Sequence, residues 1–364
     1  MTSGPVSGTR GAGRGNMRIL VTGGAGYIGS HTCVELLQAG HEVVVVDNLC
    51  NGSLAALRAV EAIAGRTLTF YPVDIRDRDA LADVFASEAV DAVFHFAALK
   101  AVGESVSLPL RYFDNNIGGL ITLCQVMADA NTRTFVFSSS ATVYGVPERV
   151  PVAEDAPVSV TNPYGRTKLV NEEMLRDLQR ALPALRVALL RYFNPGGAHP
   201  SGLLGESPHD IPNNLLPFVS QVAAGQLDQV QVHGGDYATP DGTGVRDYIH
   251  VVDLARGHIA ALDTLLHPDG EYVDGGVLTV NLGTGRGYSV LEIIGAFERA
   301  SGRTIPYVIG PRREGDVASC YADPTRARAL MGWTAEYGID RICADAWRWQ
   351  QMHPRGYLAE GHAA

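Results

Sequence analysis

The sequence has few cysteines and no long apolar run. These two features argue against a disulfide-rich protein, a zinc protein and a membrane-spanning protein. Its 364 residues include five cysteines, an odd number with no CxxC pair: Cys33, Cys50, Cys124, Cys320 and Cys343. This spacing favours reduced thiols and predicts neither a disulfide framework nor a zinc site. No apolar segment approaches the roughly 20 residues of a membrane-spanning helix. We therefore expect a cytoplasmic protein with no membrane partner and no bound metal.

Positive charge is also scarce. The chain has 29 lysines and arginines against 39 acidic residues, a net charge of -10. This balance disfavours nucleic acid or an anionic membrane as a partner, although a local basic pocket for a phosphate-bearing ligand remains compatible with it. Residues 1–16 contain glycines and arginines but no apolar core. We expect them to form a flexible leader rather than a secretory signal.

Short apolar runs alternate with helical patterns through the first half of the chain. The patterns predict strands at 18–22, 42–46, 68–73, 92–96, 134–138 and 186–191. They predict helices at 27–39, 115–130 and 164–181, the first ending at Gly40. Such alternation is typical of an α/β protein with a Rossmann-type, doubly wound parallel sheet.

The texture changes after Asn194, where prolines and glycines crowd a segment of weak periodicity. We interpret 17–193 as a dinucleotide-binding domain and 194–352 as mainly a smaller, C-terminal substrate-binding domain of loops and short helices. A strand at 278–282 is expected to return to the main sheet, and 353–364 to form a tail.

A glycine-rich segment, Gly24-Ala25-Gly26-Tyr27-Ile28-Gly29, follows the first predicted strand and opens the first predicted helix. Read with Gly23, it also has the spacing Gly23-x-x-Gly26-x-x-Gly29. Glycine lacks a Cβ, so backbone at a helix N-terminus can approach a pyrophosphate. Alone, the pattern also fits a tight strand-to-helix turn. Asp47, at the end of the second strand, makes a dinucleotide site the stronger interpretation.

Asp47 also indicates which dinucleotide is bound. Its carboxylate suits the adenosine ribose hydroxyls and would repel a 2′-phosphate, so NAD is favoured over NADP. Asp74 and Ile75 are expected to border the adenine, although Asp74 also fits a helix N-cap. After the fourth strand, small residues permit close approach to the cofactor and a lysine offers a cation: Phe96, Ala97, Ala98 and Lys100.

Tyr164 and Lys168 lie four residues apart and would share one face of a helix. A free tyrosine has a pKa of about 10, so it acts as a base near neutrality only if that pKa falls. A cation about 4 Å away contributes roughly 4 kcal/mol at an effective dielectric near 20. We therefore expect Lys168, with the positive nicotinamide, to lower the pKa of Tyr164 so that it takes a proton from an alcohol.

The serines at 138–140 end the fifth predicted strand, where active-site residues gather in such sheets. A serine there can orient the reacting oxygen. Chance occurrence is the alternative, because Tyr-x-x-x-Lys arises in many helices and serines often follow strands. Their order after a dinucleotide loop favours catalysis.

These motifs make the chain resemble the extended short-chain dehydrogenase/reductases and, within them, the UDP-hexose 4-epimerases. The resemblance runs from Met17 to about Tyr357. It is carried by Val-Thr-Gly-Gly-Ala-Gly-Tyr-Ile-Gly-Ser-His (21–31), Phe-Ser-Ser-Ser-Ala-Thr-Val-Tyr-Gly (137–145), Leu-Arg-Tyr-Phe-Asn-Pro (190–195), Gly-Thr-Gly-Val-Arg-Asp-Tyr-Ile-His-Val (242–251) and Pro-Arg-Arg-Glu-Gly-Asp (311–316).

The resemblance implies interconversion of UDP-glucose and UDP-galactose by transient oxidation at sugar C4, with tightly held NAD. It implies that Tyr164 is the base and acid, Ser140 its hydrogen-bonding partner and Lys168 the group that tunes it; all three also contact NAD. Further NAD contacts are expected from Tyr27, Ile28, Asn48, Leu49, Cys50, Asn51, Gly52, Asn115 and Phe193.

Substrate contacts are implied in the same way. Arg246 and Arg313 are expected at the diphosphate, where arginine forks match phosphate oxygens, while Arg312 is left as a surface charge. The sugar or phosphate is expected to meet Asn194. The uridine and its ribose are expected near Asn214, Leu215, Gln231, Val232, His233 and Asp316. His233 replaces an expected aromatic residue, which weakens stacking on uracil.

Cys320 bears on substrate range. Some relatives have a larger tyrosine there, so a cysteine leaves space for an N-acetyl group beside sugar C2. We expect UDP-GlcNAc and UDP-GalNAc to be interconverted as well. The alternative is that Cys320 is a small core residue.

Three other functions are compatible with parts of this pattern. A sugar-nucleotide 4,6-dehydratase would need an Asp-Glu pair where Ala141 and Thr142 stand, so epimerisation is favoured. A 4-epimerase for UDP-pentoses or UDP-uronates stays open. A protein that binds NAD without chemistry would not need Tyr164 with Lys168. The resemblance also implies a homodimer through helices near 105–130 and 162–181.

Overall fold

The computed structural model describes residues 16–207, 212, 214–267, 276–313 and 316–357. Except for Asn16, the expected leader therefore lies outside the described residues, as does most of the expected 353–364 tail. Among the described residues, no helix combines the length and apolar character needed to cross a membrane.

A seven-stranded sheet, parallel throughout, forms the centre of the larger part of the molecule. In spatial order its strands are β10 (Val277–Leu282), β6 (Arg186–Tyr192), β5 (Thr134–Ser140), β4 (Ala92–His95), β1 (Arg18–Thr22), β2 (Glu42–Val46) and β3 (Thr69–Tyr71). The strand order reverses between β1 and β4, which is where doubly wound sheets bind ligands.

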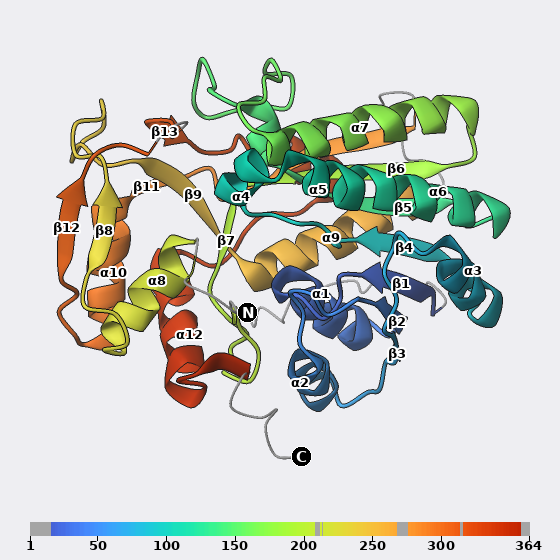
Figure 1. Ribbon diagram of the computed structural model, residues 1–364, viewed down its shortest axis with the longest axis horizontal. Helices are drawn as coiled ribbons and strands as arrows, with labels where there is room; N and C mark the ends of the chain where they lie inside the picture. Colours follow the sequence, from blue (N-terminus) through green and yellow to red (C-terminus); the bar gives the residue numbers. More distant parts are fainter. Residues whose placement is uncertain (1–15, 208–211, 213, 268–275, 314–315, 358–364) are drawn as a thin grey trace, which may run out of the picture.

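Helices cover both faces of this sheet (Figure 1). One face packs against α1 (Tyr27–Gln38), α2 (Leu54–Ala64), α9 (Val251–Leu266) and α11 (Thr325–Met331). The other packs against α3 (Arg78–Ser87), α6 (Gly119–Asp129) and α7 (Pro163–Ala181). Burial on two faces explains the apolar runs of β1 and β2. The predicted Rossmann-type α/β fold is confirmed.

The predicted boundaries of strands agree best with the observed ones where an apolar run is bounded by polar residues. β1 and β2 span the predicted 18–22 and 42–46. The predicted strand 68–73 is shorter, because only Thr69–Tyr71 pair with β2. Conversely, β5 continues to Ser140 through its pairing with β6. The predicted helix 115–130 begins as the π-helical segment η1 (Asp114–Gly118) before α6.

Two smaller sheets lie beside the large one (Figure 1). The first contains β7 (Asn194–Gly196), β9 (Val245–His250), β11 (Gly287–Ser289) and β13 (Ser319–Cys320), and the second β8 (Val230–His233) and β12 (Tyr307–Gly310). They share a core with α8 (Leu215–Ala223), α10 (Val290–Ser301) and α12 (Ile339–Met352). The sequence predicted only loops and short helices in this region. The structure instead contains regular helices, α8 to α10 and α12, among its described residues. The proposed boundary at 193/194 stays a prediction.

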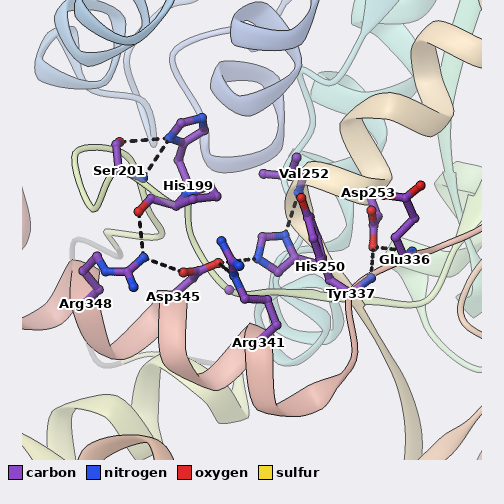
Figure 2. A network of polar contacts seen from close by, with 12 residues as sticks. His199, Ser201, His250, Val252, Asp253, Glu336, Tyr337, Arg341, Asp345 and Arg348 are labelled. Carbon is purple, nitrogen blue, oxygen red and sulfur yellow. Dashed lines mark hydrogen bonds and ion pairs between the residues drawn. The ribbon is translucent and has the colours of Figure 1, made fainter. Parts of the chain in front are cut away.

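A polar network fixes α12 against the segment after β7 (Figure 2). The buried Asp345 carboxylate accepts hydrogen bonds from the side chains of Arg341 and Arg348 and lies 3.3 Å from His250 Nε2. Arg348 also donates to the carbonyl oxygen of Pro200 at 2.7 Å. The network therefore joins the end of β9, α12 and the chain that leaves β7.

Candidate active site

The glycine loop lies at the point where the strand order reverses. Gly23 has φ +71°, and a Cβ there would lie 2.6 Å from the backbone nitrogen of Ala97. Gly26 is the N-cap of α1, and Gly29 packs against the Gly23–Gly24 backbone. The loops that follow β1 and β4 can therefore touch only because Gly23 lacks a side chain.

Asp47 binds the same loop from the end of β2. Its Oδ2 accepts from the Ala25 N–H at 3.0 Å and its Oδ1 from the Leu49 N–H at 2.8 Å. Burial raises the pKa of Asp47, and these backbone hydrogen bonds act against the shift. An ionised carboxylate has about four acceptor positions, so two remain for ribose hydroxyls.

The residues after Asp47 wrap around the start of α1. Leu49 adopts a left-handed conformation with φ 60°, while Cys50 and Asn51 are exposed. A Cβ on Gly52 would lie 2.9 Å from the Ala25 side chain. The structure therefore gathers the predicted 47–52 contacts beside the glycine loop. Ile28, in the first turn of α1, is half-buried.

Asp74 lies at the edge of this region. It accepts from Asn48 Nδ2 at 2.9 Å and pairs with Arg76 at 2.8 Å. The Arg76 hydrogen bond holds the pKa of Asp74 well below its usual range. Asp77, not Asp74, caps α3. The helix-cap alternative for Asp74 is therefore wrong, and neighbouring Ile75 is buried.

The chain leaving β4 carries Lys100 toward the predicted substrate residues. The Lys100 ammonium lies 3.2 Å from a Glu206 carboxylate oxygen, and the same oxygen accepts from Asn214 Nδ2 at 2.9 Å. Glu206 was missed from the sequence because it lies in a segment without periodicity. It connects a predicted cofactor contact with a predicted substrate contact.

Tyr164 stands in the first turn of α7, whose N-cap Asn162 accepts from the Gly165 N–H at 2.8 Å. Burial raises the pKa of Tyr164 to about 12, and a hydrogen bond with Ser140 lowers it. In the chain alone the pKa of Tyr164 is therefore not lowered, and the expected lowering by Lys168 together with the nicotinamide stays a prediction. The physical reason is that the spacing of residues gives no measure of burial, and here desolvation of the phenolate outweighs the polar contacts.

Lys168 is buried one turn further along α7. Its Nζ donates to the carbonyl oxygen of Ser138 at 2.7 Å and lies 6.0 Å from the Tyr164 ring centroid. Burial lowers the pKa of Lys168 to about 7, while the charge of Glu172 raises it. The structure thus brings Tyr164, Lys168 and Ser140 to one place, where a buried lysine with a pKa of about 7 adjoins a half-buried phenol.

A second tyrosine adjoins this group and was missed from the sequence. The Tyr192 hydroxyl hydrogen-bonds to Ser138 Oγ; burial raises the pKa of Tyr192, and the neighbouring Tyr164 adds to this shift. The available signal was the polar pair Arg191-Tyr192 at the end of β6, after the apolar run 187–190. Asn115, also a predicted contact, donates to Asn116 Oδ1 at 3.0 Å.

The predicted substrate residues come from several elements. Asn194 begins β7 directly after buried Phe193, and Cys320 on β13 stands opposite Arg246 on β9. Cys320 packs against a cluster of Val143, Tyr144, Val152, Phe193 and Ala322. Burial raises the pKa of the Cys320 thiol to about 11, so this side chain is a small neutral group near the end of β5.

The remaining predicted contacts come from the two smaller sheets, the segment between β12 and β13, and α8. Arg246 lies 3.7 Å from Asp316, and Arg313 is exposed. Along β8, Gln231 is exposed, Val232 is buried and His233 is half-buried. Val232 therefore offers only backbone to a ligand. Leu215 begins α8, and Asn214 is its N-cap.

Arg312 agrees with its interpretation as a surface charge. It pairs with Asp236 at 2.7 Å, and its guanidinium lies over the Tyr237 ring at 4.3 Å. Within the part of the chain that the structure describes, no three His, Cys, Asp or Glu side chains are grouped as metal ligands.

Comparisons with known proteins agree on one group. The model of the NAD dependent epimerase/dehydratase family matches residues 19–274. UDP-glucose 4-epimerase of Bacillus subtilis is 58% identical over 94% of this chain and 99% of its own length. UDP-glucose 4-epimerase of Dictyostelium discoideum is 56% identical over 93% and 97%. A crystal structure of UDP-glucose 4-epimerase from Bifidobacterium longum, in complex with NAD+ and UDP, is 53% identical, with a TM-score of 0.89 over 93% of this chain and all of that one.

Proposed function

The chain belongs to the NAD dependent epimerase/dehydratase family, and from this premise we propose that it is a UDP-glucose 4-epimerase. It interconverts UDP-glucose and UDP-galactose with NAD as cofactor, and we place this reaction in galactose metabolism. The observation that carries the proposal is the group formed by buried Ser140, buried Lys168 and half-buried Tyr164 at the carboxyl ends of the strands, beside the glycine loop.

The loop and its neighbours fit NAD. Only the Gly23 carbonyl lies within 4 Å of a Cβ position on Gly26, so a pyrophosphate can approach the α1 N-terminus there. Asp47 keeps two acceptor positions for ribose hydroxyls. When bound, NAD supplies a hydride acceptor that later returns the hydride to the same carbon.

The chain's own residues move the proton. Tyr164 takes the proton of the sugar C4 hydroxyl and gives it back when the sugar is reduced on its other face. Ser140 hydrogen-bonds to Tyr164 and orients the sugar oxygen. Protonated Lys168 favours the phenolate, and its contact with the Ser138 carbonyl fixes its position.

Epimerisation is favoured over dehydration by the residues that follow Ser140. Elimination of water needs an additional acid and base. Ala141 and Thr142 occupy the short helix η2 (Ala141–Tyr144), and Thr142 Oγ1 donates to Ser140 Oγ at 3.0 Å. Neither residue is a carboxylate, so the chain lacks the elimination machinery at this point.

The deciding experiment incubates the purified protein with UDP-galactose and no added NAD. We expect UDP-glucose to form, because the cofactor is retained through each turnover. Tyr164→Phe should lose turnover about 10²–10⁴-fold, the usual contribution of general acid–base catalysis, and still contain NAD. No UDP-glucose from the wild-type protein, even with added NAD, would overturn the proposal. Unchanged turnover in Tyr164→Phe would overturn the role of the tyrosine.

We extend the substrate range to UDP-GlcNAc and UDP-GalNAc because of Cys320. Its small side chain packs against the buried cluster that includes Phe193 and Tyr144. A tyrosine at that position would occupy the space that an N-acetyl group needs.

We also propose that the enzyme is a homodimer. Large apolar side chains are exposed on and around α4 (Val102–Ser107) and α5 (Pro109–Phe113), which lie against α7 (Figure 1). Leu110 is 79% exposed and Val106 63%. Such a patch is expected to be covered, and these helices fall within the predicted interface. The five unpaired cysteines, with Cys50 exposed, support a cytoplasmic location.

A further inference from the structure

A buried ion pair lies behind the catalytic group and takes no part in the steps above. Glu172 on α7 and Arg191 on β6 lie 2.6 Å apart, with side chains 2% and 6% exposed. Arg191 Nε also donates to both Glu172 oxygens, at 2.9 and 3.2 Å. A planar guanidinium that binds a carboxylate through several N–H groups fixes both side chains. The pair therefore joins α7 to the large sheet.

The contacts of this pair reach the end of β5. Ser139 Oγ donates to Glu172 Oε1. Side chains alternate along a strand, and Phe135, Phe137 and Ser139 face α7, as Leu189 and Arg191 do on β6. Glu172 thus accepts hydrogen bonds from both of the strands that it faces, from Ser139 on β5 and from Arg191 on β6.

The α7 residues at intervals of four each engage one of three successive serines. Tyr164 hydrogen-bonds to Ser140, Lys168 to the Ser138 carbonyl and Glu172 to Ser139. Residues four apart share one face of a helix. The same face of α7 therefore carries the acid–base tyrosine, its lysine and the carboxylate of the buried pair.

We propose that Glu172 and Arg191 are positioning residues, a charge-neutral pair that sets the location and protonation of Lys168 and thereby prepares Tyr164 for proton transfer. This inference rests on the proposed function. Neither residue has to touch the substrate. The pair acts through the helix face and through the charge that Glu172 places one turn from Lys168.

The charged and titratable groups around Lys168 make the effect testable. Tyr164 and Glu172 adjoin it on α7, His95 faces it from β4, and Tyr192 and Arg191 lie on β6. His95 is neutral above acidic pH, because burial lowers its pKa to about 3. The charges that can be altered near Lys168 are thus those of the buried pair.

Removing Glu172 and removing Arg191 should shift the pKa of Lys168 in opposite directions. Glu172→Gln removes the negative charge and leaves Arg191 uncompensated, so Lys168 loses its proton at lower pH. Arg191→Met leaves Glu172 uncompensated, so Lys168 keeps its proton to higher pH. A unit charge one helical turn away, at an effective dielectric near 20, shifts a pKa by about one to two units. A merely structural role would move both variants the same way.

The experiment measures kcat and KM for UDP-galactose against pH in the holoenzyme. Activity requires protonated Lys168, so kcat falls on the alkaline side. We expect that limb to move to lower pH by about one to two units in Glu172→Gln and to higher pH in Arg191→Met. Misplacement of Tyr164 should reduce the plateau kcat about 100-fold in Glu172→Gln, with KM within about two-fold of the wild-type value. Glu173→Gln, exposed on the same helix, is the matched control.

Two control measurements and one further variant protect the test against loss of folding. NAD content and the thermal transition are recorded for every variant. If Arg191→Met does not fold, Glu172→Asp replaces it: the charge stays, so the alkaline limb should stay, while kcat falls. If the alkaline limb of the kcat–pH profile does not move in Glu172→Gln and Arg191→Met, or moves in the same direction in both, the inference is overturned. An inactive wild-type enzyme instead overturns the proposed function.

Discussion

The Tyr27 hydroxyl donates a hydrogen bond of 2.7 Å to the carbonyl oxygen of Gly197, which lies 170 residues further along the chain. Tyr27 is the first residue of α1, directly after the glycine loop, and Gly197 follows β7. One bond therefore connects the expected NAD site with the segment that leads to the substrate residues.

Loss of this bond should loosen the cofactor. Tyr27→Phe leaves the Gly197 carbonyl without its partner, which costs about 1–3 kcal/mol for a buried acceptor. We expect NAD to leave the purified variant faster than the wild-type enzyme. Tyr71→Phe removes a hydroxyl that bonds Glu88 at 3.0 Å and should retain NAD normally. Equal retention in both variants would contradict a link between Tyr27 and the cofactor.

Replacing Gly29 or Gly26 of the loop by alanine should impair two different properties, folding in the first case and NAD binding in the second. A Cβ on Gly29 would overlap the Gly23 carbonyl oxygen, so Gly29→Ala should destabilise the fold itself. A Cβ on Gly26 meets only that oxygen, at 3.2 Å. Gly26→Ala should therefore fold and yet bind NAD poorly, because its methyl group faces the pyrophosphate. Denaturant unfolding and NAD content, measured together, distinguish the two. A Gly26→Ala protein with full NAD would refute the loop's role.

Cys320→Tyr should narrow the substrate range. The ring would add volume beside the cluster against which Cys320 packs, and steric exclusion of this kind changes kcat/KM by about 10–200-fold. We expect N-acetylhexosamine turnover to fall by this factor, with UDP-galactose turnover largely kept. Cys320→Ser, similar in size, should turn over both pairs. If N-acetylhexosamine turnover survives the tyrosine, the volume explanation is wrong.

Charge on the exposed apolar patch should separate the subunits. Leu110→Asp places a carboxylate on a side chain that is 79% exposed in the single chain. Burying that carboxylate in an interface is costly, so the variant should elute and sediment as a monomer while the wild-type protein is a dimer. Val308→Asp, on the exposed face of β12, is the control and should leave the oligomeric state unchanged. A Leu110→Asp dimer would place the interface elsewhere.

Buried histidines should make the fold sensitive to acid. Burial lowers the pKa of His31 and His95 to about 3 and that of His258 to about 4. In the unfolded chain each titrates near 6.5. The unfolded state therefore gains protons first, and stability is lost as pH falls from about 6.5 toward 4 for His258 and toward 3 for His31 and His95.

At pH 5 each histidine should cost about 2 kcal/mol of unfolding free energy. Denaturant unfolding at pH 7.5 and pH 5 measures the loss. His258→Leu, whose ring lies among Phe94, Phe96 and Tyr192, should reduce that loss by about the share of one histidine. The same loss with and without His258 would show that this histidine is not responsible.

Local patterns predicted most of the fold and the central site residues. Apolar runs located β1 and β2, and the spacing of Tyr164 and Lys168 placed them on one face of α7. These features depend on neighbours within a few residues, and such neighbours are visible in a sequence.

Features that depend on distant packing were missed. Arg191 and Glu172 are each a lone charge in the sequence, and only the approach of α7 to β6 makes them partners. Glu206 likewise meets Lys100 through a loop that has no periodicity. The pKa of Tyr164 was expected to fall, whereas burial raises it. Burial is set by the whole fold and cannot be judged from the spacing of residues. The return of α9 to the large sheet has the same origin.

The last strand of the large sheet, β10, is made from residues Val277–Leu282 and lies against β6. During synthesis on the ribosome, the β6 edge has therefore emerged long before the strand that covers it. An uncovered edge of apolar parallel strand is a site for intermolecular pairing. The nascent protein consequently passes through a stage in which aggregation competes with completion, and a chaperone that shields this edge would raise the yield of native enzyme.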